Sequence, residues 1–215
     1  MIPKASVSGV YDRIAPVYDL WAWLTERNAR RRCLELAAIR DGEDVLEVAA
    51  GTGLAFADIL AANPSGHNEG IDLTPAMLAR AERKAARSGT DNYRLRVGDA
   101  YQLDFPDDSF DVLVNNYMFD LLPEADFPLV LEEFRRVLRP GGRLAMVNMT
   151  LGERWYNGLW RRLYELNPAL LGGCRGVTLL PFLLDCGFEQ ATREYLSQMT
   201  FPSEVVCGVA PNSPA

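Results

Sequence analysis

A glycine-rich turn contains the first residues whose types and order indicate a ligand-binding site. It follows a short apolar run in the order Glu47-Val48-Ala49-Ala50-Gly51-Thr52-Gly53, and a helical pattern begins at Leu54. Small residues let the backbone turn sharply and approach a ligand, and the following helix offers unpaired N–H groups at its positive end. A tight strand-to-helix connection without a ligand would use the same residues, so the turn alone is a weak signal.

Two acidic residues follow the next two predicted strands. Asp72 comes 19 residues after Gly53, where a carboxylate can accept hydrogen bonds from both hydroxyls of a ribose. Asp99 lies in Gly98-Asp99-Ala100, which leaves room beside the acid for a flat base. Either acid alone is consistent with a helix cap or a solvated turn. Polar signals after three successive strands together predict one site for a nucleoside.

Alternating strand-like and helix-like segments must position these residues. The predicted strands are 44–48, 69–72, 93–97, 110–114, 144–149, 189–196 and 205–209, and the predicted helices are 54–62, 76–87, 127–138 and 177–186. This alternation predicts an α/β fold in which helices cover both faces of a mostly parallel sheet. Ligands of such sheets bind beyond the carboxyl ends of the strands, near the point where strand order reverses.

Composition argues against several function classes. The 215 residues suit one domain, and the net charge of −7 is a poor match to a phosphate backbone, so we expect no nucleic-acid partner. The one histidine, His67, is predicted in a polar loop, which disfavours a histidine-based triad. The four cysteines form no CxxC pair, so we expect reduced thiols and no metal site. The run Arg30-Arg31-Arg32 is predicted as a solvated helix face.

The expected location is the cytoplasm. No apolar run approaches the roughly 18 residues that a membrane-spanning helix needs. The first thirty residues contain acids and a proline where a signal peptide needs an apolar stretch.

Five motifs, in this order and spacing, resemble the class I S-adenosylmethionine-dependent methyltransferases. The resemblance is to the ubiquinone/menaquinone-methylase type and to bacterial phosphatidylethanolamine N-methyltransferases, and it covers about residues 10 to 149. The motifs are Tyr11-Asp12 with APVYD, VLEVAAGTGL, GIDLTPAML, VGDAYQLDFPDDSFDVL and FRRVLRPGGRL. The resemblance implies a Rossmann-like doubly wound, mostly parallel seven-stranded sheet with an antiparallel last strand and a helical cover. It also implies S-adenosyl-L-methionine as the cofactor.

The resemblance further implies roles for single residues. The glycine motif and its acid would contact the methionine part, Asp72 the ribose, and the segment after the fourth strand the methyl group. Ala49 departs from the family's usual glycine, and alanine is tolerable there if the local φ is negative. The implied cofactor-binding residues are Tyr11, Glu47, Ala49, Gly51, Gly53, Asp72, Leu73, Asp99, Ala100, Asn115 and Asn116.

The acceptor side is predicted from fewer signals. In-line methyl transfer depends on alignment, and it needs a base only if the acceptor must lose a proton. Tyr117, Tyr18 and Tyr11 are predicted to shape the acceptor site, and Asp120 is a candidate base or partner of a cationic acceptor. Each tyrosine is equally consistent with a half-buried aromatic that only packs.

Two regions are predicted to lie outside the sheet. Residues 1–40 are predicted as an N-terminal helical cap, and residues 41–215 as the methyltransferase domain with a helical insertion at about 151–176. Within the insertion, aromatic and basic residues interleave over 153–166, which indicates a lid over a lipophilic acceptor or a peripheral membrane contact. A plain packing helix is the alternative. Cys174 admits an arsenite-type methyltransferase that uses thiolates, but no partner cysteine lies near it in the sequence.

The sequence therefore predicts methyl transfer to a small, lipophilic or amphipathic acceptor: a phospholipid amine, a quinone precursor or a similar metabolite. Two alternatives stay open. A nicotinamide-dependent oxidoreductase uses a similar turn, but its fingerprint needs a small residue where Phe56 stands. A non-catalytic regulatory protein that binds S-adenosylmethionine would present the same site. The oligomeric state is not predicted.

Overall fold

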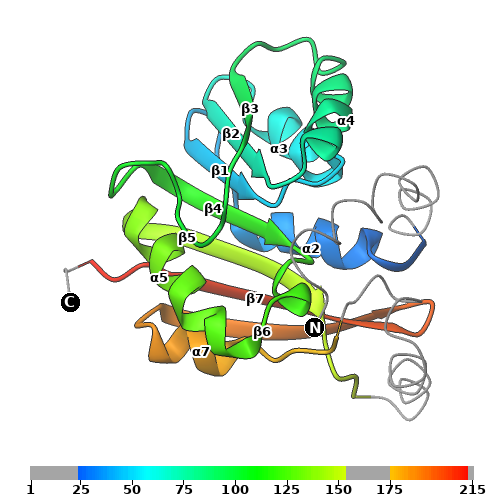
Figure 1. The fold of residues 1–215 in the computed structure, drawn as a ribbon, viewed down its shortest axis with the longest axis vertical. Coiled ribbons are helices and arrows are strands. Elements are labelled where there is room, and N and C mark those ends of the chain that lie inside the picture. Colours follow the sequence, from blue (N-terminus) through cyan, green and yellow to red (C-terminus); the bar gives the residue numbers. More distant parts are fainter. Residues whose placement is uncertain (1–23, 154–174, 213–215) are drawn as a thin grey trace.

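A single seven-stranded sheet runs through the computed structural model of this chain, which we describe for residues 24–153 and 175–212 (Figure 1). The strand order is β3-β2-β1-β4-β5-β7-β6. The strands are β1 (Asp44–Val48), β2 (His67–Asp72), β3 (Tyr93–Val97), β4 (Phe110–Asn116), β5 (Leu138–Met149), β6 (Glu189–Gln198) and β7 (Phe201–Val209).

Strand direction confirms the predicted sheet. The first five strands pair in parallel, whereas β7 pairs antiparallel with both β5 and β6. Strand order reverses between β1 and β4, which are neighbours in the sheet although β2 and β3 intervene in the chain. We call the edge where β1 to β5 end the carboxyl edge. The reversal places the expected ligand crevice there, between β1 and β4.

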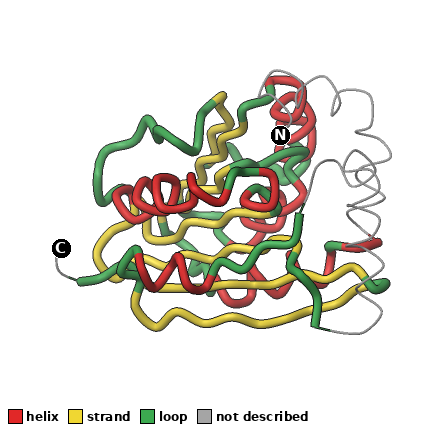
Figure 2. The backbone as a smooth tube through the Cα atoms, turned by 60° about the horizontal axis from the view of Figure 1, so that its bottom comes forward, coloured by secondary structure: helices red, strands yellow, loops and turns green. Residues whose placement is uncertain are grey.

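Helices cover both faces of the sheet (Figure 2). On one face, α2 (Arg27–Ala37) packs on β4, β5 and β7, and α3 (Leu54–Ala62) packs against α4 (Pro75–Ala85). On the other face, α5 (Phe127–Val137) packs on β5 and α7 (Leu180–Asp185) on β6. Two short 3-10 turns, η1 (Phe119–Leu121) and η2 (Glu124–Asp126), connect β4 to α5. The largest buried cluster lies under α5 and α7 and includes Phe119, Phe127 and Phe134.

Local sequence explains most element boundaries. Thr74 is extended and Pro75 begins α4, as a first-turn proline does. The prediction for β5 was too short: the strand begins at Leu138 and takes in Pro140-Gly141-Gly142, because Gly141 and Gly142 exchange backbone hydrogen bonds with Ala210. The loop prediction for His67 was wrong, since His67 is the first residue of β2 and its Nε2 lies 3.1 Å from Glu69 Oε1.

Several predictions fall outside the described residues. Tyr11, Tyr18, Cys174, most of the predicted cap and nearly all of the 151–176 insertion belong to these stretches, so the lid and the membrane contact stay predictions. Within residues 24–153 and 175–212, no helix has the length and apolar character to cross a membrane. In the same ranges, no group of three or more His, Cys, Asp or Glu residues could hold a metal ion.

Candidate active site

The turn after β1 is held in left-handed backbone conformations. Its φ angles are +60° at Ala49, +54° at Gly51 and +78° at Gly53. The condition under which alanine is easily tolerated at position 49, a negative φ, is therefore not met. The reason is the hydrogen bond from Ala50 N to Ile71 O (2.9 Å), which pulls the chain towards β2 immediately after β1 ends. An alanine in this region of φ costs roughly 1–2 kcal/mol relative to its ordinary conformations.

The two glycines of the turn have different surroundings. A Cβ on Gly51 would meet nothing closer than Ala49 O at 4.0 Å, so the space beside it is open. A Cβ on Gly53 would lie 2.7 Å from Ala81 Cα and 2.8 Å from Ala81 Cβ. Gly53 therefore allows the start of α3 to pack against α4, and Gly51 leaves room for a ligand beside the turn.

Asp72 ties the two loops at the ends of β1 and β2 together. One carboxylate oxygen accepts the Gly51 N–H at 2.9 Å, and the other accepts the Thr74 N–H at 2.8 Å. Burial raises the pKa of this carboxyl, and the two backbone hydrogen bonds oppose that rise. A carboxylate has about four lone-pair sites, so the two bonds leave acceptor capacity for a pair of ribose hydroxyls.

The loop after β3 lies next to Asp72. Gly98 N donates to Asp72 O at 3.1 Å, and the Asp99 carboxylate accepts the Tyr101 N–H at 3.0 Å. Ala100 is buried, whereas the Leu73 side chain is 56% exposed. The predicted ribose and adenine residues are thus neighbours at the carboxyl edge, with an exposed leucine beside them.

Glu47 and Asn116 meet at the point where β1 and β4 end. Asn116 Nδ2 donates to Glu47 Oε1 at 3.1 Å, and Glu47 is 1% exposed. The second Glu47 oxygen and Asn116 Oδ1 are buried without a hydrogen-bond partner among the described residues. Burial raises the pKa of Glu47 to about 8, with a smaller opposing effect from the Asn116 hydrogen bond. These acceptors therefore need a donor, and an ammonium group is one.

Asn115 plays a part different from Asn116. Its Nδ2 donates to Val48 O at 2.8 Å, and the side chain is completely buried. This bond fixes the end of β4 to the end of β1, so Asn115 shapes the crevice from behind. Its Oδ1 is buried without a hydrogen-bond partner in the part of the chain that we describe.

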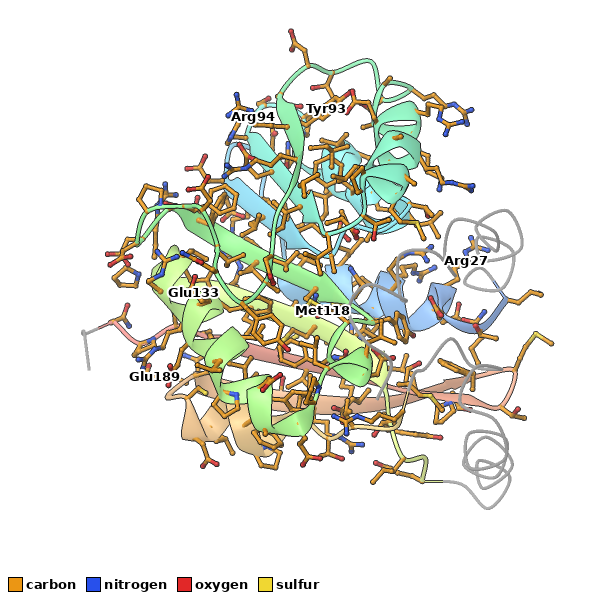
Figure 3. The ribbon with its side chains drawn as sticks, viewed as in Figure 1. Arg27, Tyr93, Arg94, Met118, Glu133 and Glu189 are labelled. Atoms are coloured by element: carbon orange, nitrogen blue, oxygen red, sulfur yellow. The ribbon has the colours of Figure 1, made fainter. Side chains whose placement is uncertain are left out.

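Tyr117, which is predicted to shape the acceptor site, comes directly after β4. It has a φ of +50°, its backbone N–H donates to Val147 O at 2.7 Å, and its hydroxyl lies 2.8 Å from Ser203 Oγ on β7. Desolvation by burial raises the pKa of the Tyr117 hydroxyl well above its usual range. The next residue is Met118. In Figure 3 it lies towards the same end of the sheet as Arg27, the first residue of α2.

Two buried acids accompany Tyr117. Asp120 in η1 is completely buried, and Glu26, the residue before α2, is 7% exposed. The pKa of Glu26 is raised to about 8, chiefly by desolvation on burial and also by the Asp120 charge, while Arg30 acts against both. The predicted Tyr117 and Asp120 thus lie in one neighbourhood, which also contains Glu26 and Arg30.

Sequence reasoning missed Glu26, Arg30 and Ser203. The prediction of a solvated face was wrong for Arg30, whose side chain is 12% exposed because α2 packs across β4, β5 and β7. Arg30 influences Glu26, Glu47 and Tyr117 electrostatically, so it lies between the acceptor side and the Glu47 end of the crevice. A period-3.6 burial pattern on residues 27–37 is the signal that could have found it.

Comparison with known proteins identifies the family of this chain. Residues 45–142 match the model of a methyltransferase domain. The chain is 34% identical over 170 residues to the 2-phytyl-1,4-naphtoquinone methyltransferase of Synechococcus elongatus, covering 75% of this chain and 70% of that one. It is 35% identical over 159 residues to the demethylmenaquinone methyltransferase of Thermus thermophilus, covering 72% and 71%. This chain belongs to the S-adenosylmethionine-dependent methyltransferases.

Other matches are more partial. The arsenite methyltransferase of Halobacterium salinarum is 32% identical over 139 residues, but this chain spans only 34% of its length. The methyltransferase bound to the Trm112 activator of Haloferax volcanii is 21% identical, with a TM-score of 0.77 over 97% of this chain and 99% of that one. At that identity the likeness shows the fold alone. The oxidoreductase alternative fails, since the family of this methyltransferase uses S-adenosylmethionine.

The residues of the crevice fit that cofactor. Glu47 Oε2 and Asn116 Oδ1 are buried acceptors that an α-ammonium would satisfy. The open space beside Gly51 allows close approach of a ligand to the backbone. Asp72 keeps lone pairs for the ribose, and Asp99 adjoins it. We take these residues as the cofactor half of the site and Tyr117, Asp120 and Glu26 as the acceptor half.

Proposed function

We propose that this methyltransferase moves a methyl group from S-adenosyl-L-methionine to a lipophilic acceptor that carries an ionisable hydroxyl, of the quinol type. S-adenosylmethionine supplies a methyl group already activated on a sulfonium. The chain's own residues then have to orient the acceptor, exclude water and accept a proton where the acceptor loses one.

The observation that carries the proposal is the mixed character of the acceptor half. Buried acids, Glu26 and Asp120, lie beside Tyr117, whose ring is 6.3 Å from the buried ring of Phe201. An aromatic wall suits a flat ring, and a carboxyl group with a raised pKa suits removal of a hydroxyl proton. Two relatives that are 34% and 35% identical to this chain over the aligned residues are named for naphthoquinone and menaquinone substrates, which supports the same class.

A phospholipid amine is the second candidate, because buried carboxyls would also pair with a cationic headgroup. The two candidates separate in one assay. The purified chain is incubated with methyl-labelled S-adenosylmethionine and, in parallel, with a reduced naphthoquinol bearing a short isoprenoid tail or with phosphatidylethanolamine vesicles. We expect label in the naphthoquinol. Label in the vesicles alone would favour the amine, and label in neither with intact S-adenosylhomocysteine binding would favour a non-catalytic binding protein.

A further inference from the structure

Glu26 is a buried acid at a helix start that does not cap its helix. It is the N-cap residue of α2, yet its side chain makes no hydrogen bond to the N–H groups of the first turn. Capping residues ordinarily satisfy one of those donors, and that bond is the usual reason for a polar side chain at this position. Glu26 is only 7% exposed, so its carboxyl group has also lost most of its contact with water. A carboxylate buried at this cost without a capping role needs another explanation.

The position of Glu26 gives that explanation. The residues just before and inside the first turn of α2 are fixed to the carboxyl edge, because Gln198 at the end of β6 donates to Leu24 O (2.6 Å) and accepts the Asn28 N–H (2.7 Å). Three charged or titratable side chains from separate elements act on Glu26 or share its surroundings: Arg30 of α2, Asp120 of η1 and Tyr117 after β4. Tyr117 and Asp120 belong to the acceptor half of the crevice. Glu26 is therefore part of that half too.

We propose that Glu26 is the proton acceptor that activates the acceptor hydroxyl for methyl transfer, an inference that rests on the proposed function. The Glu26 carboxylate takes the hydroxyl proton and becomes a neutral carboxylic acid. The electron pair freed on the acceptor oxygen forms the O–CH₃ bond, and the pair of the broken S–CH₃ bond stays on sulfur, which becomes a neutral thioether. The proton leaves Glu26 to solvent after release of the product.

Neighbouring groups are less suited to this role. The Tyr117 hydroxyl is held by Ser203, and its pKa lies far above its usual range, so it stays protonated. Asp120 is completely buried, and its negative charge raises the pKa of Glu26. Both carboxyl groups are buried, but Glu26 keeps the larger exposed fraction, 7% against 0% for Asp120, and this difference favours Glu26 as the group that exchanges its proton.

Arg30 connects this base to the cofactor half. Its backbone N–H donates to Glu26 O at 2.9 Å, one helical turn away, and its guanidinium lowers the pKa of both Glu26 and Glu47. Arg30 therefore stabilises whichever of the two carboxylates is ionised. Arg30 is a positioning residue, and no contact with the reacting atoms is assigned to it.

The test compares E26Q with a matched control on the same helix. E35Q makes the same chemical change at an exposed glutamate that pairs with Arg31 and Arg32. We expect E26Q to lower kcat with the naphthoquinol by about 100-fold or more, the usual contribution of a general base. E26D should recover part of that loss, and E35Q should match the wild type. S-adenosylhomocysteine affinity, measured by calorimetry, should be unchanged in all three variants.

The pH profile gives a readout that a merely structural residue would not move. Because Glu26 acts as a carboxylate, kcat/KM should rise with pH through an acid limb near the Glu26 pKa of about 8. D120N removes a like charge and should move the limb to lower pH, whereas R30M removes the opposing cation and should move it to higher pH. E26Q should abolish the limb.

Failure of this inference is distinguishable from failure of the proposed function. A wild-type chain that methylates the quinol while E26Q keeps its rate and its acid limb would overturn the role of Glu26. A wild-type chain that methylates no hydroxylic acceptor would overturn the proposed function first. An E26Q variant that no longer binds S-adenosylhomocysteine would also overturn the inference, because it would show that Glu26 supports the fold or the cofactor half.

Discussion

Alanine at Gly51 and at Gly53 separates the two tasks of the glycine turn. Both residues have positive φ angles, +54° and +78°, so either alanine should cost about 1–2 kcal/mol of stability through backbone strain. Only at Gly53 does the new Cβ meet backbone, 2.7 Å from Ala81 Cα. Overpacking of that kind costs a further 1–3 kcal/mol or so. G53A should therefore be destabilised by roughly 2–5 kcal/mol and G51A by roughly 1–2 kcal/mol.

Urea unfolding of the two variants without cofactor measures this difference in the free energy of unfolding. The m-value should be the same in both variants, because a changed m-value would mean that the folded or unfolded state itself had changed. S-adenosylhomocysteine affinity should change in the opposite order, because the G51A methyl group enters the open space beside the turn. We expect G51A to lose more affinity than G53A. Equal stabilities, or a G51A variant that binds as tightly as the wild type, would refute the assignment of Gly51 to the ligand and Gly53 to the packing of α3 on α4.

Substitutions at Ala49, Glu47 and Asp44 test the turn after β1, the buried acid of β1 and the opposite edge of the sheet. A49G should stabilise the chain by about 0.5–1 kcal/mol in thermal unfolding, because it relieves the left-handed strain, while A50G, at a position without a positive φ, should not. Glu47 titrates near 4.5 when unfolded and near 8 when folded, so its contribution to stability is present below pH 4.5 and lost as pH rises through 8. The difference in stability between E47Q and the wild type should therefore shift in favour of E47Q when the pH is raised from 5 to 9. E47Q should nevertheless bind S-adenosylhomocysteine more weakly than the wild type does. D44N should weaken the Arg139 ion pair at the opposite edge by less than about 1 kcal/mol without any change in cofactor affinity, since Arg139 also keeps Asp111.

The cofactor half of the site was accessible to sequence reasoning because local patterns encode it. The turn Ala49 to Gly53 follows a strand whose burial pattern is visible in the sequence, and Asp72 ends a second predicted strand. Parallel pairing then brings the strand ends together with no further information. What local pattern could not supply was the conformation of the turn: Ala49 has a positive φ because of a hydrogen bond between Ala50 and Ile71, which only the folded pair of strands creates.

The acceptor half was harder to predict, because side chains from distant segments form it. Glu26 and Tyr117 meet through the packing of α2 on the sheet, and Ser203 joins them from a strand that runs in the opposite direction. No periodicity or spacing in the sequence relates these three positions. Arg30 likewise looked like one of three solvated arginines until the docking of α2 buried its side chain. Long-range packing, rather than motif, decides which polar residues face the acceptor.

Calorimetric titration of S-adenosylhomocysteine into the wild type, D72A and the exposed-acid control D104A measures whether Asp72 helps to bind the adenosyl group. D104A removes a carboxylate whose side chain is 98% exposed. Loss of two hydrogen bonds to a charged acceptor, each worth about 1.5–3 kcal/mol, predicts at least a roughly 100-fold weaker Kd for D72A. The control should match the wild type, and NAD should bind to none of the three. An unchanged Kd in a folded D72A protein would contradict a single adenosyl site built from Gly51, Asp72 and Asp99.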